Sequence, residues 1–105
     1  MDKNIPLTEA LFYILLAVNK PNHGYGIIQD VEKWTNGRVV LGAGTLYGAI
    51  QSLEKKQWIA IYSEDTSSRK KKEYLITSAG KRALDDEILR LEELLKNAKL
   101  IGGEK

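Results

Sequence analysis

Hydrophobic residues recur at helical spacing in three consecutive segments of the first half of the chain. Residues 7–19 are apolar on almost every side, so we expect this helix to contact a partner chain as well as its own core. Residues 25–35 and 43–57 form the next two predicted helices, separated from the first by turn-forming residues at 21–24. Their predicted inward positions are Ile27, Ile28, Val31 and Trp34 in the second helix, and Leu46, Ala49, Ile50 and Leu53 in the third.

The pattern then changes to two short extended runs. Residues 58–63 and 72–77 are predicted to be the strands of a hairpin, because the second run alternates polar and apolar residues and turn formers separate the two. Asn36 and Gly37 tolerate the left-handed backbone and are expected to end the second helix. The first half therefore predicts three helices followed by a two-stranded hairpin.

A long helix over residues 78–100 is predicted to follow, with Thr77 as its N-terminal cap and residues 101–105 as a frayed tail. Its acidic cluster at 85–87 lies early in the helix, where negative charge favours the positive end of the helix dipole. Apolar residues repeat along it at spacings of four, three, four and three, which predicts pairing with another helix. These residues are Leu84, Ile88, Leu91, Leu95 and Ala98.

The composition narrows the chemistry that is open to the chain. With 105 residues, no cysteine and one histidine, disulfide, thiolate and Cys/His zinc chemistry are all excluded. His23 lies in the predicted turn, where we expect local hydrogen bonding. Residues 5–18 are apolar but include Glu9, are too short for a membrane span and lack a signal-peptide pattern. We therefore predict a cytoplasmic chain with no metal, no cofactor and no membrane contact.

The segment VVLGAGTLYGAIQSLEKK, residues 39–56, also resembles the start of a dinucleotide-binding unit. Glu64 and Asp65 even follow at the distance of a ribose-binding acid. However, Tyr47 stands where the third glycine of that motif is needed for close packing of helix and strand. The preceding apolar run is only about four residues long, and no further alternation of strands and helices follows to build a covered parallel sheet. We therefore predict that the chain is not an enzyme.

The charge distribution favours a different function for the same segment. Residues 42–76 carry six basic and four acidic groups, whereas the segments before and after are each balanced, so the net charge of +2 lies in the middle of the chain. Three helices followed by a basic hairpin are typical of a winged helix-turn-helix, in which the third helix enters the major groove of DNA. Gly42 and Gly44 are expected to permit a tight turn and a close approach to a phosphate.

The predicted fold is therefore α+β and mostly α: a winged helix-turn-helix over residues 1–77, followed by a dimerisation helix and short tail over residues 78–105. Double-stranded DNA is the expected partner, read by hydroxyl and amide groups of the third helix and held by cations at its phosphates. The predicted contacts in the third helix are Ala43, Gly44, Thr45, Tyr47, Gln51, Ser52 and Lys55. Those in the hairpin are Arg69, Lys70, Lys71 and Lys72.

Three strings in the chain together resemble the PadR family of bacterial and archaeal transcriptional regulators. They are HGYGIIQDVE at residues 23–32, GTLYGAIQSLEKK at residues 44–56 and KKEYLITSAGKRAL at residues 71–84. The resemblance covers residues 7–98 and is strongest to the short subfamily with a single C-terminal helix. Three residues depart from the family's usual ones: Gly48 affects the first turn of the recognition helix, and Gln57 and Trp58 affect the turn into the wing. These departures leave the exact operator contacts open.

The resemblance implies a homodimer that represses transcription from a palindromic operator. It implies that residues 43–57 form the recognition helix, with Thr45, Tyr47 and Gln51 as its main contacts, and that residues 64–72 form the wing. It further implies that Tyr25 and Tyr74 pack between the helices and the wing. The first and last helices would hold the dimer through Leu11, Phe12, Leu15, Leu84, Ile88, Leu91, Leu95 and Ala98.

The resemblance also implies a small hydrophobic or aromatic effector at the dimer interface. No aromatic residue follows residue 78, so the walls of such a site would come from Phe12, Tyr13 and Leu16 with the last helix of the partner, unless these residues are plain dimer core. Two alternatives stay open at this stage. The chain could be a winged-helix module that binds another protein through the surface around Tyr47 and Trp58, or a protein that binds chromatin or RNA without sequence preference.

Overall fold

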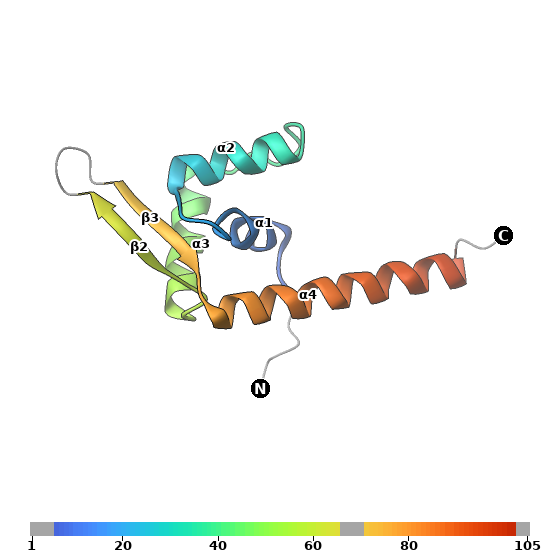
Figure 1. The fold of residues 1–105 in the computed structure, drawn as a ribbon. Coiled ribbons are helices and arrows are strands. Elements are labelled where there is room, and N and C mark those ends of the chain that lie inside the picture. Colours follow the sequence, from blue (N-terminus) through green and yellow to red (C-terminus); the bar gives the residue numbers. More distant parts are fainter. Residues whose placement is uncertain (1–5, 66–70, 103–105) are drawn as a thin grey trace.

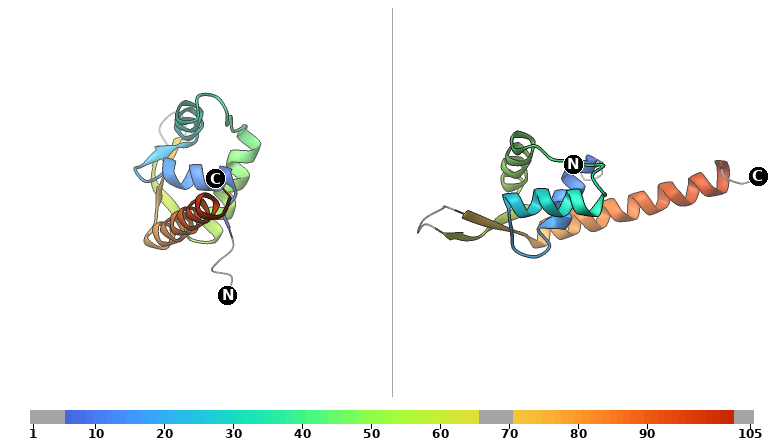
Figure 2. Two further views of the ribbon diagram at one scale, coloured as in Figure 1. Left: turned by 90° about the vertical axis from the view of Figure 1, so that its right-hand side faces the viewer. Right: turned by 90° about the horizontal axis from the view of Figure 1, so that it is seen from above.

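The computed structural model describes residues 6–65 and 71–102 and contains a helical body from which a hairpin and a long helix project (Figure 1). The hairpin and the long helix leave opposite sides of this body. Seen along the long helix, the three shorter helices gather on one side of it (Figure 2). In chain order the elements are α1 (Glu9–Ala17), β1 (Asn22–His23), α2 (Gly24–Trp34), α3 (Ala43–Lys55), β2 (Ile59–Asp65), β3 (Lys71–Ile76), α4 (Ser78–Asn97) and a π-helical turn, η1 (Ala98–Gly102).

Side chains cap the helices where the sequence predicts it. The Thr77 hydroxyl accepts a hydrogen bond from the Gly80 amide (3.0 Å) and starts α4. His23 has the local role expected of it, because its Nδ1 accepts from the Gly26 amide (3.1 Å) and caps α2. At the other end of α2, Asn36 and Gly37 adopt φ angles of 53° and 82°. The predicted left-handed ending is therefore confirmed.

The sheet has three strands instead of the predicted two. Its order is β1-β3-β2, and both pairings are antiparallel, so β3 lies in the centre. The short strand β1 pairs Asn22 with Tyr74 and His23 with Glu73, in a segment that the sequence assigned to a turn. A strand of two residues is too short to show an alternating pattern, which explains the wrong assignment. β2 is an edge strand with a register shift between Ile61 and Ser63.

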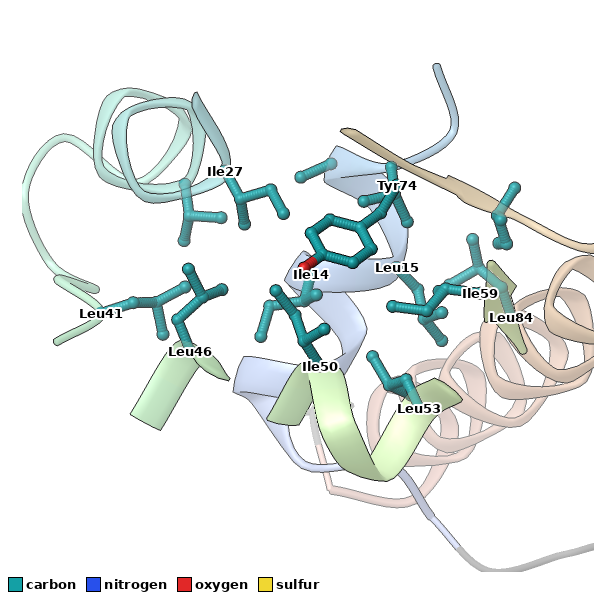
Figure 3. Packing of buried hydrophobic residues seen from close by; sticks show 14 residues of the cluster. Ile14, Leu15, Ile27, Leu41, Leu46, Ile50, Leu53, Ile59, Tyr74 and Leu84 are labelled. Atoms are coloured by element: carbon teal, nitrogen blue, oxygen red, sulfur yellow. The ribbon is translucent and has the colours of Figure 1, made fainter. Parts of the chain in front are cut away.

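The core lies between α1, α2, α3 and the inner face of the sheet (Figure 3). Leu46, Ile50 and Leu53 are buried and Ala49 is partly buried, so the predicted inward stripe of α3 is confirmed. Each large buried side chain stabilises the fold by about 1.5–3 kcal/mol relative to an exposed one. In α2 the prediction holds for Ile27, Ile28 and Val31 but is wrong for Trp34. Trp34 is the last residue of α2, beyond the packed part of the helix, and is 48% exposed.

Several boundaries differ from the predicted ones by about a turn of helix or less. α1 is shorter than expected at both ends, and α3 ends at Lys55 instead of residue 57. Ile101 and Gly102 belong to η1, so this part of the predicted frayed tail is helical. None of the helices within the described residues is both long enough and apolar enough to cross a membrane.

The acidic cluster in α4 does not serve the helix dipole. The first turn of α4 holds no acidic residue, and the effect of the dipole fades within that turn. Asp85 and Asp86 are exposed, whereas Glu87 is buried and accepts hydrogen bonds from Arg90 (Nε to Oε1, 3.0 Å). The Arg90 guanidinium lowers the pKa of Glu87, against the effect of burial. Glu87 is therefore a buried carboxylate that is paired with an arginine of its own helix.

Candidate DNA-binding surface

The predicted contacts of α3 lie together on the solvent side of this helix. Leu46, Ile50 and Leu53 hold the opposite side in the core, which fixes the rotation of α3 about its axis. The structure thus brings the predicted residues of the recognition helix onto one continuous surface of hydroxyl, amide, ammonium and bare backbone groups. All of them are exposed: Ala43, Gly44, Thr45, Tyr47, Gln51, Ser52 and Lys55.

The backbone conformation of the chain does not require glycine at the glycine positions of this surface. Gly42 precedes α3 with φ of −80°, and neither Gly44 nor Gly48 is among the described residues with positive φ. A Cβ atom added at any of the three would meet nothing within 4 Å. The turn before α3 therefore does not depend on the conformational freedom of Gly42 and Gly44. The open space at these glycines leaves the α3 backbone accessible from solvent, and their close approach to a phosphate stays a prediction.

Tyr47 packs against the start of α2. A Cβ atom on Gly24 would lie 2.2 Å from the Tyr47 hydroxyl oxygen, so the ring covers this glycine. Half of the Tyr47 side chain is nevertheless exposed on the α3 surface. Two separate helices therefore set the position of this phenol, a long-range contact that sequence spacing alone does not reveal.

The two other tyrosines of the predicted packing group differ from each other. Tyr74 is buried, and its ring points from β3 into the core (Figure 3), as expected for packing between the helices and the wing. Tyr25 is 65% exposed at the start of α2, so its predicted packing role is wrong. It lies two residues before Ile27 in the chain, and this places it on a different side of α2 from the buried residues.

The wing extends from the end of α3 (Figure 1). Lys72 is exposed in β3 and pairs in register with Glu64, and Lys71 begins the strand opposite Asp65. Arg69 and Lys70, two of the four predicted wing cations, lie outside the described residues. The described part of the hairpin thus places Lys72 on the exposed surface of the wing.

The turn from α3 into the wing is built on Gln57, whose φ of 63° is unusual for a residue other than glycine. Its carbonyl accepts a hydrogen bond from the Thr77 hydroxyl (2.7 Å), and the Trp58 carbonyl accepts from the Thr77 amide (2.9 Å). The Lys56 ammonium lies 5.2 Å from the centre of the Trp58 ring, within the range of a cation–π contact. These contacts join the end of α3, the wing and the start of α4 at one point.

The predicted dimer residues divide into two groups. Leu15 has no exposed surface and Leu84 is 7% exposed, so both belong to the core of the single chain and are not available to a partner. Periodicity alone missed this, because one stripe of α4 serves the core in its first half and faces solvent in its second. Leu11, Phe12 and Ile88 are partly buried against the core. The remaining predicted residues are exposed: Leu91, Leu95 and Ala98. Two further leucines of α4 that were not predicted, Leu89 and Leu94, are exposed as well.

A groove with a volume of about 990 Å³ runs between the N-terminal segment and α4. Leu7, Leu11 and Trp58 line it together with Leu89 and charged residues of α4. The proposed aromatic walls of an effector site, Phe12 and Tyr13, do not line this groove. Their rings contact each other edge to face, with 6.0 Å between the ring centres.

Three helices, of which the third exposes a hydrogen-bonding face, and a wing define the chain as a winged-helix protein of the class that binds DNA. Residues 13–86 match the Transcriptional regulator PadR-like family. The chain belongs to this family, which confirms the resemblance seen in its sequence. The family comprises regulators of transcription.

Individual proteins are similar to the chain over most of its length. A protein of Lysinibacillus sphaericus that is described only as uncharacterized is 40% identical over 72 residues, which are 68% of this chain and 66% of that protein, just under two thirds. A PadR family regulator from Clostridium difficile R20291 is 25% identical, with a TM-score of 0.72 over 89% of this chain and 97% of that one. A PadR family regulator from Eggerthella lenta DSM 2243 reaches a TM-score of 0.77 at 22% identity, over 90% of this chain and 82% of that one.

Proposed function

We propose that the chain is a homodimeric repressor that reads a palindromic operator with α3 and grips the flanking phosphates with its wing. The observation that carries this proposal is the single exposed surface of α3, which combines hydrogen-bonding side chains with glycines that no internal contact explains. Residues 1–77 supply the DNA-binding part and residues 78–105 the dimer contact. In a dimer of this kind the two recognition helices lie about 34–36 Å apart, one turn of DNA.

The second half of α4 supports pairing with another copy. Every residue from 91 to 102 is exposed in the single chain, and Leu91, Leu94 and Leu95 are 39%, 50% and 57% exposed. The acidic pair at 92 and 93 lies on one side of Leu95, and lysines 96 and 99 lie on the other. Antiparallel pairing about Leu95 would place the acids of each copy opposite the lysines of the other, and this self-complementarity is what a twofold interface requires.

A small hydrophobic or aromatic effector is the proposed release signal. It would bind between Phe12 and Tyr13 of one chain and the exposed α4 surface of the other, where its presence would alter the angle between the two helices. Such a ligand shifts the equilibrium between two arrangements of the dimer only to the extent that it binds one arrangement more tightly than the other. The support for this part is that both aromatic rings lie on α1 in contact with each other and are only partly buried against the core.

Binding of fluorescent duplex DNA at several salt concentrations tests the proposal. The native chain is compared with a variant in which Arg69, Lys70, Lys71 and Lys72 are alanine. Phosphate contacts release counterions, so we expect the logarithm of affinity to fall with the logarithm of salt concentration, and the slope of the variant to be shallower by about one unit per lost contact.

A matched pair of variants keeps the charge change constant. Lys71→Ala with Lys72→Ala removes two cations from the wing, and Lys81→Ala with Arg82→Ala removes two exposed cations from the start of α4. Only the wing variant is expected to show a shallower dependence of affinity on salt, by about two units of slope. Weak binding without salt dependence in all variants would refute DNA binding and favour the protein-interaction module. Light scattering on the same samples reports the dimer.

A further inference from the structure

Gly24, the first residue of α2, is buried beneath the ring of Tyr47. A Cβ atom at this position would lie 2.2 Å from the Tyr47 hydroxyl oxygen and 2.9 Å from its Cζ, closer than real Cβ atoms come to other groups. Gly24 does not have the positive φ that itself favours glycine. The side chain of Tyr47, and not the backbone, is therefore what a larger residue here would disturb.

We propose that Gly24 is a positioning residue for DNA reading, because it forms the seat that holds the Tyr47 phenol in one direction on the α3 surface. This inference rests on the proposed DNA-binding function. A tyrosine on an exposed helix face has two freely rotating bonds, and fixing them before binding removes part of the entropy cost of binding. The hydroxyl can then donate to a phosphate or pair with a base edge from a fixed position.

The seat is firmly held by the residues around it. The His23 ring caps α2 at the Gly26 amide, and the side-chain amide of Asn22 donates to the Ala17 carbonyl and to Asp30 Oδ2, at 3.0 Å each. These bonds join the start of α2 to the end of α1 and to the next turn of α2. The seat is therefore fixed relative to α1 and to the body of α2, and α3 lies against it through Leu46, whose Cδ2 would be 3.4 Å from a Cβ atom on Gly24.

A methyl group at position 24 is expected to redirect Tyr47 without unfolding the chain. The atoms in its way are the far end of a side chain that is half exposed, so the ring can swing towards solvent. Alanine also favours a helix more than glycine does, which offsets the lost contact. Gly24→Ala should therefore stay folded and change the direction of one phenol.

Fluorine NMR of the full chain labelled with 3-fluorotyrosine tests the seat without DNA. The chain has five tyrosines, and Tyr→Phe variants assign their resonances. We expect Gly24→Ala to move the resonance of Tyr47 towards that of the exposed Tyr25 and to leave the resonance of the buried Tyr74 in place. An unchanged Tyr47 resonance would overturn the seat.

The reading role is tested with the duplex that the native chain selects from a random pool, against a scrambled duplex of the same composition. Gly24→Ala and Tyr47→Phe are each expected to lower the preference for the selected duplex by about threefold to tenfold, the worth of one hydrogen bond. The double variant should lose no more than either single variant, because both act on one contact. Tyr25→Phe serves as the control, and its effect should multiply with that of Gly24→Ala.

The outcomes separate this inference from the proposed function. Effects of Gly24→Ala and Tyr47→Phe that multiply would overturn the positioning role while leaving DNA binding intact. A native chain that selects no duplex would overturn the proposed function, and the reading role with it, whatever the fluorine spectra show. A shifted Tyr47 resonance together with non-multiplying losses supports the inference.

Discussion

Gly48→Ala is expected to stabilise the folded chain and to weaken its binding to DNA. Gly48 lies in the middle of α3 on the exposed surface, its φ is not positive, and a Cβ atom there would have no neighbour within 4 Å. Nothing inside the chain therefore requires glycine at this position. Glycine in the middle of a helix destabilises by about 0.5–1 kcal/mol relative to alanine, so the substitution should recover this amount.

Thermal and urea unfolding followed by circular dichroism measure the gain. For a domain of this size, a gain of 0.5–1 kcal/mol corresponds to a rise in melting temperature of about 2–8 °C. The urea midpoint should rise with an unchanged slope, since the substitution does not alter the surface exposed on unfolding. Gly102→Ala is the control for DNA binding, because Gly102 also has open space but lies in η1 at the far end of α4.

Binding to the selected duplex is expected to change in the opposite direction. If the exposed face of α3 enters the groove as proposed, a methyl group on it holds α3 away from the bases. The loss of one base contact costs about 1–3 kcal/mol, so affinity should fall by at least about fivefold. Gly102→Ala should bind as the native chain does. If Gly48→Ala proves more stable and binds the duplex unchanged, the middle of α3 does not approach DNA and the glycine argument is refuted.

Three further predictions concern the turn into the wing, the dimer and the buried ion pair. Gln57→Gly should stabilise the chain by about 0.5–1 kcal/mol in urea unfolding, since relief of the left-handed backbone outweighs the added chain entropy. Asn36→Gly is the control and should gain less, because asparagine tolerates this conformation. Equal gains in the two variants would contradict the reasoning. Leu95→Glu should convert the dimer to monomers in light scattering, because it introduces a charge in the middle of the proposed interface, and a persistent dimer would place the interface elsewhere. The pKa of Glu87 is lowered in the folded chain, so the ionised carboxylate stabilises the fold at pH values above the ordinary pKa of a carboxyl group. This stabilisation is lost as the pH falls through the lowered pKa. The stability difference between the native chain and Arg90→Gln should therefore shrink in acid, and a difference that persists at the lowest pH would show that the arginine acts through packing alone.

Local patterns in the sequence were sufficient for the helices and most of the core. The stripe of Leu46, Ile50 and Leu53 lies inward because helical periodicity places these residues on one side, and no distant contact alters this. The cap at Thr77 was predictable for the same reason, since its partner Gly80 lies three residues away. The exposure of the predicted contacts of α3 was predictable as well, because these residues lie on the sides of the helix that the buried stripe does not occupy.

Features that depend on contacts between distant segments were not predictable in this way. Strand β1 exists only because β3 lies beside Asn22 and His23. The seat of Tyr47 on Gly24 joins residues from separate helices, and each residue alone has an ordinary surface explanation. Gly24 lay in the predicted turn, where glycine is common, so no local pattern in the sequence pointed to the seat.

The junction at Thr77 offers a physical route by which the proposed dimer could control α3. Thr77 bonds to the carbonyls of Gln57 and Trp58, and a Cβ atom on Gly80 would lie 2.2 Å from the Trp58 carbonyl oxygen, so α4 begins in direct contact with the end of the recognition helix. α4 has 20 residues and is about 30 Å long, so a tilt of about 5° moves its far end by roughly 3 Å. Conversely, a ligand that moves the paired ends of α4 by that distance tilts the junction by the same angle. Because the junction is close-packed, we expect α3 to follow this tilt, which in the proposed dimer would change the spacing of the two recognition helices on DNA.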